Sequence, residues 1–131
     1  MSDTITRDKI DELLAFLPAF EDPDGAFIEE WVVKPGHIPY PVYHADVRTF
    51  FILAGRHWWC DFDYLSNDAG KIVRDDQRIA NATLSEIKTM LTFCVRGERF
   101  ADGRWGHVLQ EGRVQALLRR LAELRDSVPA T

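Results

Sequence analysis

Apolar residues recur at the spacing of an α-helix in several stretches of the chain. The first stretch follows Thr6, an effective N-cap residue. Pro18 predicts its end near Leu17, because proline disfavours helical geometry in the preceding residue. A second helix is predicted from Tyr43 to Ala54, where Gly55 follows as a typical residue just beyond a helix C-terminus. The apolar positions of these two predicted helices are Ile10, Leu13, Leu14, Leu17, Val47, Phe50, Phe51 and Ala54.

The second half of the chain predicts two stronger helices. Thr83 and Glu86 have the spacing of a capping box, which begins one helix, and Gly97 is expected to end it. Gly112 precedes the other. A short helix over residues 66–76 and one or two turns over 105–110 complete the helical prediction. The apolar positions of the two stronger helices are Leu84, Ile87, Leu91, Cys94, Val95, Val114, Leu117, Leu118, Leu121 and Leu124.

Three further segments favour extended structure. Residues 26–33 suit a short buried helix or a strand, and the pattern leans towards a strand, whereas residues 39–43 are an extended lead into the next helix. Residues 58–64 alternate apolar and acidic side chains in their second half, which predicts an extended segment. The fold class is therefore mainly α: a single compact domain of about five helices over residues 1–131 with one small strand pair or extended segment. Frayed ends are expected at residues 1–4 and 127–131.

Composition places the chain among globular proteins. It has 131 residues, of which 46% are hydrophobic and 28% charged, and this balance supports a packed core. The sequence has no apolar run long enough to cross a bilayer and no signal-peptide pattern at its start, so we expect no membrane partner. Cys60 and Cys94 are too few for a disulfide framework. Together these features predict a cytoplasmic location.

The net charge of −5 is unevenly spread along the chain. Residues 1–68 carry 13 acidic and 5 basic side chains, whereas residues 69–131 carry 8 acidic and 11 basic ones. Either the acidic front half packs against the basic rear half, or an arginine-bearing face meets an acidic partner. The first is favoured, because charge runs usually form solvated faces. Nucleic acid is not expected as a partner, since the pI is near 5.3 and lysines are few.

The run from Arg96 to His107 is the most distinctive part of the sequence. It combines arginines, acids, glycines and aromatic residues between two helical segments, and arginine and tryptophan are the residue types that most often anchor contacts. Two acids at alternate positions of the 58–64 segment could approach this run in the fold. The candidate interaction or cleft residues are Arg96, Glu98, Arg99, Asp102, Arg104, Trp105, His107, Asp61 and Asp63.

Two interpretations of these acids remain open. Convergent carboxylates with His107 could bind a hard cation or move protons. Alternatively, the acids form ion pairs with the neighbouring arginines and fix the loop, which is favoured because arginine binds carboxylates bidentately. A zinc set of two histidines and two cysteines lacks paired ligand spacing, and Cys94 falls on the apolar side of its helix. We therefore expect no metal and no cofactor, and no catalytic residue is assigned.

Three segments carry a resemblance to other proteins: residues 39–43, residues 61–64 and residues 96–106. With them the chain resembles a bacterial family of small proteins of unknown function. The resemblance implies a compact domain from bacteria or their phages or plasmids, and it brings no known activity, substrate or catalytic residue.

The sequence favours binding over catalysis. We expect a protein-binding role, inhibitory or regulatory, with Arg96, Arg99, Arg104 and Trp105 near the contact surface. The alternative is a small enzyme or ligand-binding domain with a cleft lined by carboxylates, histidine and arginine. The apolar stripe of the last helix leaves a homodimer open.

Overall fold

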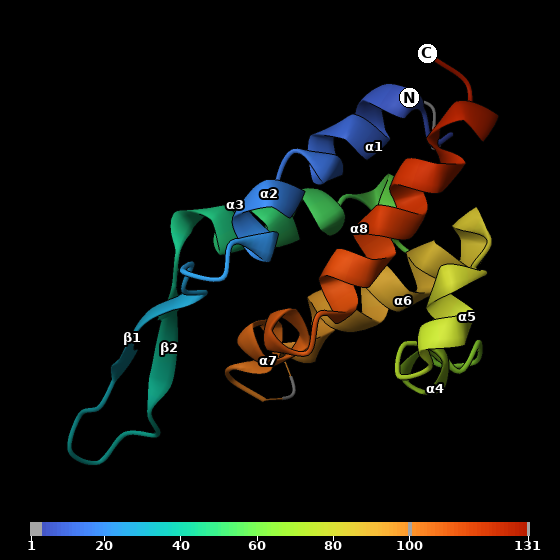
Figure 1. Ribbon diagram of the computed structural model, residues 1–131. Coiled ribbons are helices and arrows are strands. Elements are labelled where there is room, and N and C mark those ends of the chain that lie inside the picture. The colour runs from blue at the N-terminus through green and yellow to red at the C-terminus, as the bar shows by residue number, and fades with distance from the viewer. Residues whose placement is uncertain (1–3, 100, 131) are drawn as a thin grey trace.

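The computed structural model describes residues 4–99 and 101–130 and shows a mainly α single domain with one antiparallel strand pair, as predicted. Figure 1 shows the helices gathered into one body, from which the strand pair projects. The elements, in chain order, are α1 (Arg7–Leu14), α2 (Leu17–Glu21), β1 (Ile28–Val32), β2 (Tyr40–Tyr43), α3 (Ala45–Ala54), the 3-10 turn η1 (His57–Trp59), α4 (Ala69–Ile72), α5 (Asp76–Ala80), α6 (Leu84–Gly97), α7 (Arg104–Gln110), α8 (Arg113–Leu124) and η2 (Arg125–Ser127).

Helix α8 is the central element of the body. Its apolar stripe is buried, with Leu117, Leu118 and Leu121 fully covered, and it packs against α1, α5, α6 and α7. Full burial of a leucine stabilises a fold by about 2 kcal/mol relative to exposure, so this stripe holds the helices together. Among the described residues, the apolar stripe of α8 is therefore part of the core of a single chain.

Ion pairs join the acidic front half of the chain to the basic rear half. The Arg125 guanidinium donates to both carboxylate oxygens of Asp11, at 2.6 and 2.8 Å, and Arg119 donates to Glu21 at 2.8 Å. The hydrogen bond from Arg125 lowers the pKa of Asp11 and outweighs partial desolvation. The favoured interpretation of the charge asymmetry is confirmed for these pairs.

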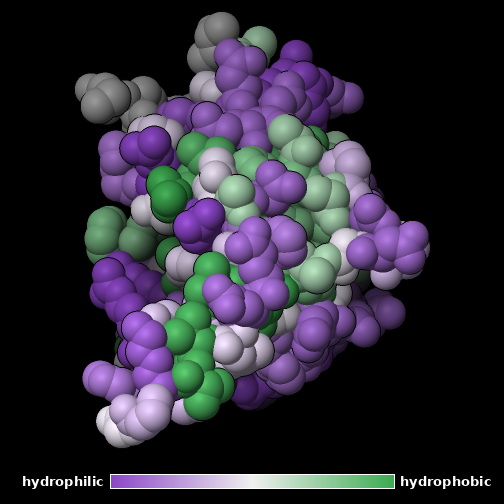
Figure 2. Space-filling view, turned by 90° about the vertical axis from the view of Figure 1, so that its left-hand side faces the viewer, coloured by the Kyte–Doolittle hydropathy of each residue, from purple (hydrophilic) through white to green (hydrophobic). Residues whose placement is uncertain are grey.

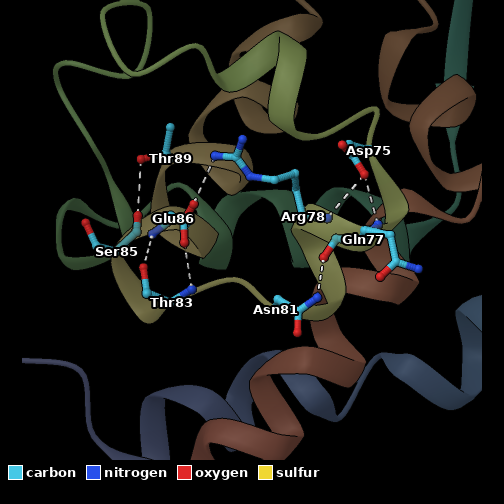
Figure 3. Close-up of polar contacts among 8 residues, drawn as sticks. All are labelled: Asp75, Gln77, Arg78, Asn81, Thr83, Ser85, Glu86 and Thr89. Carbon is cyan, nitrogen blue, oxygen red and sulfur yellow. Dashed lines mark hydrogen bonds and ion pairs between the residues drawn. The ribbon is translucent and has the colours of Figure 1, made fainter.

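The turn between α5 and α6 is closed by side-chain caps, drawn in Figure 3. The Thr83 hydroxyl accepts from the Glu86 backbone N–H at 3.2 Å, and the Glu86 carboxylate accepts from the Thr83 N–H at 3.0 Å, so the predicted capping box is confirmed. Asp75 caps α5 by accepting from the N–H of Gln77 and of Arg78. The Arg78 side chain then reaches Glu86 at 3.3 Å. These contacts fix α5 against the start of α6.

The strands form a projecting hairpin, visible at the lower left of Figure 1. Ile28 pairs with Tyr43 at its base and Val32 with Tyr40 near its tip, and a register irregularity follows Ile28. The strand that the sequence favoured within residues 26–33 is confirmed. An isolated hairpin is marginally stable in water, so this one depends on what its base contacts.

Four details of the predicted elements are wrong. The helix predicted from Tyr43 begins at Ala45, because Tyr43 pairs with Ile28 as the last residue of β2. The first helix begins after Thr6 as predicted but ends at Leu14, and Pro18 lies in the first turn of α2, where its missing N–H costs nothing. The extended segment over 58–64 is instead η1 followed by turns, because the Asp61 carboxylate accepts from the Asp63 N–H and closes a turn. The helix over 66–76 is reduced to α4, since Asp68 has a φ of 56° that interrupts helical backbone.

The two ends of the described chain lie close together (Figure 1). The Arg7 N–H donates to the Pro129 carbonyl at 3.0 Å, and Val128 is buried. Of the ends expected to fray, residues 1–3 and 131 lie outside the described residues. Across the described residues, no helix combines the length and apolar character that spanning a membrane requires.

Candidate functional site

The Glu98 carboxylate lies at the centre of the segment from Arg96 to His107. Its Oε1 accepts hydrogen bonds from the Tyr43 hydroxyl at 2.8 Å and the Trp105 backbone N–H at 2.9 Å, and its Oε2 accepts from the Gly103 N–H at 2.8 Å. We call these four residues the Glu98 cluster. Burial, followed by the hydrogen bond to Glu98, raises the pKa of Tyr43 well above its ordinary value, so the hydroxyl remains a donor. One carboxylate thus joins α6, α7 and β2.

Trp105 is held by internal contacts. Its ring stacks on Phe51 with the ring centres 4.5 Å apart and 7° between the planes, and it lies beside Tyr43. Its indole Nε1 donates to the Val95 carbonyl at 2.9 Å. The half-buried ring therefore anchors α7 to α3 and α6, and the structure gives it a packing role where the sequence suggested a contact surface.

Two glycines, Gly106 in α7 and Gly103 in the turn before it, let the hairpin approach α7 closely. A Cβ on Gly106 would lie 2.9 Å from Ile28 Cδ1, and one on Gly103 would lie 2.9 Å from Cη2 of Trp31. Gly103 also has a φ of 92°, which side chains rarely adopt. Gly103 and Gly106 of the distinctive run are therefore explained by the hairpin, which packs against them, whereas Gly97 faces the Arg104 side chain.

The arginines of the run do not form the expected ion pairs. Arg96 lies over the Tyr64 ring, 5.2 Å from its centre, and its guanidinium is 3.5 Å from Cys60 Sγ. Arg99 is exposed, and Arg104 lies between α6 and α8 on a small hollow described below. Among the described residues, none of these arginines forms an ion pair with the predicted acids, so the ion-pair interpretation of the loop is wrong. At the Glu98 carboxylate, backbone N–H groups are the donors in place of arginine.

Asp61 forms a second, separate cluster with the start of the loop before α4. Its carboxylate accepts from the Thr89 hydroxyl at 2.6 Å, the Asn67 amide at 2.9 Å and the Asp63 N–H at 2.9 Å. Desolvation opposes ionisation, but the hydrogen bonds from these donors outweigh it and lower the pKa of Asp61. Asp61 and Asp63 line an open groove of about 540 Å³ together with Lys88. The Asp61 carboxylate thus has three hydrogen-bond donors from within the protein.

The nine predicted residues are divided among several places on the molecule. Asp61 and Asp63 share the groove beside α6, whereas His107 lies on α7, where its Nε2 is 3.3 Å from Glu111. Asp102 is exposed on the turn before α7. Cys94 is buried under α7 and α8, and burial raises the pKa of its thiol to about 12. Within the described part of the chain, no three His, Cys, Asp or Glu side chains are grouped to hold a metal ion.

A hollow beside the hairpin was not predicted. It is a groove of about 650 Å³ between β1, α2 and α7, which we call the acidic groove. Its apolar wall includes Phe20, Ile28 and Leu109, and Gln115 lines it with an Oε1 that has no partner in the structure. Its acidic residues are Glu21, Asp22, Glu29 and Glu30. In the sequence, this groove was indicated by the acids of the turn after α2 and of strand β1.

The far half of the hairpin exposes large apolar side chains. Trp31, Val33, Ile38 and Tyr40 have exposed fractions of 48%, 72%, 84% and 40%. Figure 2 shows the hairpin side of the molecule, where apolar residues form a strip bordered by hydrophilic ones. We call these four residues the hairpin patch. In the sequence, the hairpin patch is indicated by two apolar residues on either side of the turn around Gly36.

These features define a class: a small, mainly α domain with a projecting hairpin, its base fixed by a polar cluster and its tip apolar. The chain belongs to a family of unknown function, DUF6508, whose model matches residues 5–127. The resemblance to an uncharacterised family is thereby confirmed. A search of curated proteins found no match, and neither did a search of solved structures.

Proposed function

We propose that the protein acts by binding another protein through the hairpin patch and the adjoining acidic groove. The role is that of a regulator or inhibitor in the cytoplasm of a bacterium. The hairpin replaces Arg96, Arg99, Arg104 and Trp105 as the main contact surface, because Trp105 is held internally and the hairpin projects from the body (Figure 1).

The observation that carries the proposal is the exposure of the hairpin patch. Large apolar side chains grouped on a projecting element are typical of interaction sites, since a monomer gains nothing from leaving them in water. In the described residues the sheet has two strands, so each strand has one unpaired edge that can accept a further strand. The patch and the open edges lie on the same element and support a partner bound in extended form.

Charge complementarity defines the partner segment. Of the acids in the groove, Glu21 is paired with Arg119 and Glu29 lies 3.6 Å from His44, while Glu30 extends from β1 into solvent. The groove therefore keeps a negative rim over an apolar wall. A partner segment that carries lysine or arginine beside an apolar side chain satisfies both features.

Site-specific photo-crosslinking tests the proposal in the cells that produce the protein. A photoreactive side chain at Ile38 probes the hairpin patch, and one at Ile52, which is 63% exposed on α3, is the matched control. We expect a crosslinked protein from position 38 and none from position 52, with the attachment point mapping to a basic segment. The charge-reversal variant Glu29→Lys/Glu30→Lys should remove the product, and Asp63→Lys should leave it.

Two outcomes contradict the proposal. Equal crosslinking from positions 38 and 52 would show that the hairpin has no special role. A product that survives charge reversal in the groove would show that the acids do not select the partner.

A further inference from the structure

A small hollow on the other side of α7 carries a concentration of basic side chains. It has a volume of about 100 Å³ and lies among the end of α4, α6, α7 and the start of α8. Its walls are formed by Val73, Arg74, Phe93, Arg104, His107, Val108, Glu111 and Arg113. We propose that this hollow is a binding site for the phosphate group of a small phosphate monoester.

The charges of the hollow are only partly neutralised. Glu111 is shared between His107, at 3.3 Å, and Arg113, at 3.8 Å, and Arg113 also donates to the Val73 carbonyl at 2.8 Å. Neither Arg74 nor Arg104 forms an ion pair with a carboxylate of the described residues. Arg113 also lies 3.8 Å from the exposed carboxylate of Asp76. Three guanidinium groups against the two carboxylates of Glu111 and Asp76 leave a net positive site, which favours an anion.

Arg104 supplies an independent observation. Its Nε is buried from solvent and has no hydrogen-bond partner in the structure. A buried donor without an acceptor is destabilising, and a shift of the Arg104 side chain towards a phosphate oxygen in the hollow would give this donor an acceptor. Arginine is also the side chain whose planar fork best matches phosphate oxygens. Charge and an unsatisfied donor therefore point to the same class of ligand.

The surroundings define the rest of the ligand. A hollow of about 100 Å³ holds a phosphate group but no larger body. A groove of about 570 Å³ shares Arg74 and Phe93 with it and adds Lys71 and Leu65. The organic part of the monoester would lie in this groove, against Phe93. The site is separate from the hairpin patch, so it goes beyond the proposed protein-binding function.

Calorimetric titration with phenyl phosphate, inorganic phosphate and benzoate tests the site. We expect phenyl phosphate to bind the wild type best. Arg74→Gln should weaken it by about tenfold, because a charge-assisted contact is lost. Arg74 is exposed, so this variant should fold. Arg48→Gln, an exposed arginine on α3, removes the same charge elsewhere and should bind as the wild type. In NMR spectra the Nε–H signal of Arg104 should shift on titration.

Each other outcome has a definite meaning. Equal binding of inorganic phosphate would assign free phosphate as the ligand and still support the anion site. Benzoate binding as tightly as phenyl phosphate would overturn the choice of phosphate. No binding at millimolar ligand, equal weakening in Arg48→Gln, or an unmoved Arg104 signal would overturn the site itself.

Discussion

Two loops of this protein are each closed around one carboxylate, and they differ in what the carboxylate holds. Glu98 accepts from β2 and from the first turn of α7, so it joins elements that lie 55 residues apart in the sequence. Asp61 accepts from Asn67 and the Asp63 N–H, which belong to its own loop, and from Thr89 on α6. Both use neutral donors, but the first cluster positions the hairpin and the second shapes a surface loop. Removing each carboxylate should therefore have different consequences.

The largest effect is expected for Glu98→Ala. It leaves the Tyr43 hydroxyl and the N–H groups of Gly103 and Trp105 without their acceptor in a partly buried place. We expect a loss of about 3 kcal/mol in the free energy of unfolding, measured by denaturant titration. The melting temperature should fall by roughly 10 °C. Asp102→Ala, at an exposed acid of the same loop, is the control, and an equal effect of the two variants would contradict the role of the cluster.

The Glu98 cluster also shows where sequence reasoning reaches its limit. The amphipathic spacing of α6 and α8 and the capping box at Thr83 are local signals, and each predicted its element correctly. The donors of Glu98 are two backbone N–H groups and a tyrosine from β2, none of which a local pattern reveals. Arginine was the obvious neighbouring partner for Glu98 in sequence, but the turn before α7 brings N–H groups to it first.

The same limit explains the errors in the loop before α4. Alternation of Cys60, Phe62 and Tyr64 predicted an extended segment, yet Phe62 is 75% exposed and Tyr64 is buried. The Asp61 carboxylate closes a turn at this point, so the side chains no longer alternate between two faces. The exposed apolar tip of the hairpin was missed for a related reason. A pattern shows which residues are apolar, but only packing shows which of them remain uncovered.

A smaller effect is expected for Tyr43→Phe. The ring and its contacts with Trp105 remain, but Glu98 loses one of its three donors. We expect a loss of about 1.5 kcal/mol in the free energy of unfolding, roughly half of the Glu98→Ala effect. Glu98→Ala/Tyr43→Phe should cost less than the sum of the single changes, since both remove the same hydrogen bond. Strict additivity in this double-mutant cycle would argue against the contact.

Asp61→Ala should cost less again, about 1 kcal/mol by the same denaturant measurement. Water can replace the carboxylate at the exposed Asn67 amide, and the Thr89 hydroxyl already lies 3.1 Å from the Ser85 carbonyl. A loss as large as that of Glu98→Ala would show that the loop before α4 is as important to the fold as the hairpin base. That result would remove the contrast between the two clusters.

The pH dependence of stability gives the finest test of the Asp61 cluster. The pKa of Asp61 is lower in the folded state, so its contribution is present above its unfolded pKa of about 3.9 and is lost as the pH falls through the folded value. Asp11 and Glu86 also have lowered pKa values, so the wild type loses stability in acid for several reasons. The difference between wild type and Asp61→Asn isolates one group. It should be constant above pH 5 and shrink below pH 4. A difference that stays constant down to pH 2 would mean that the three donors around Asp61 do not favour its charged form.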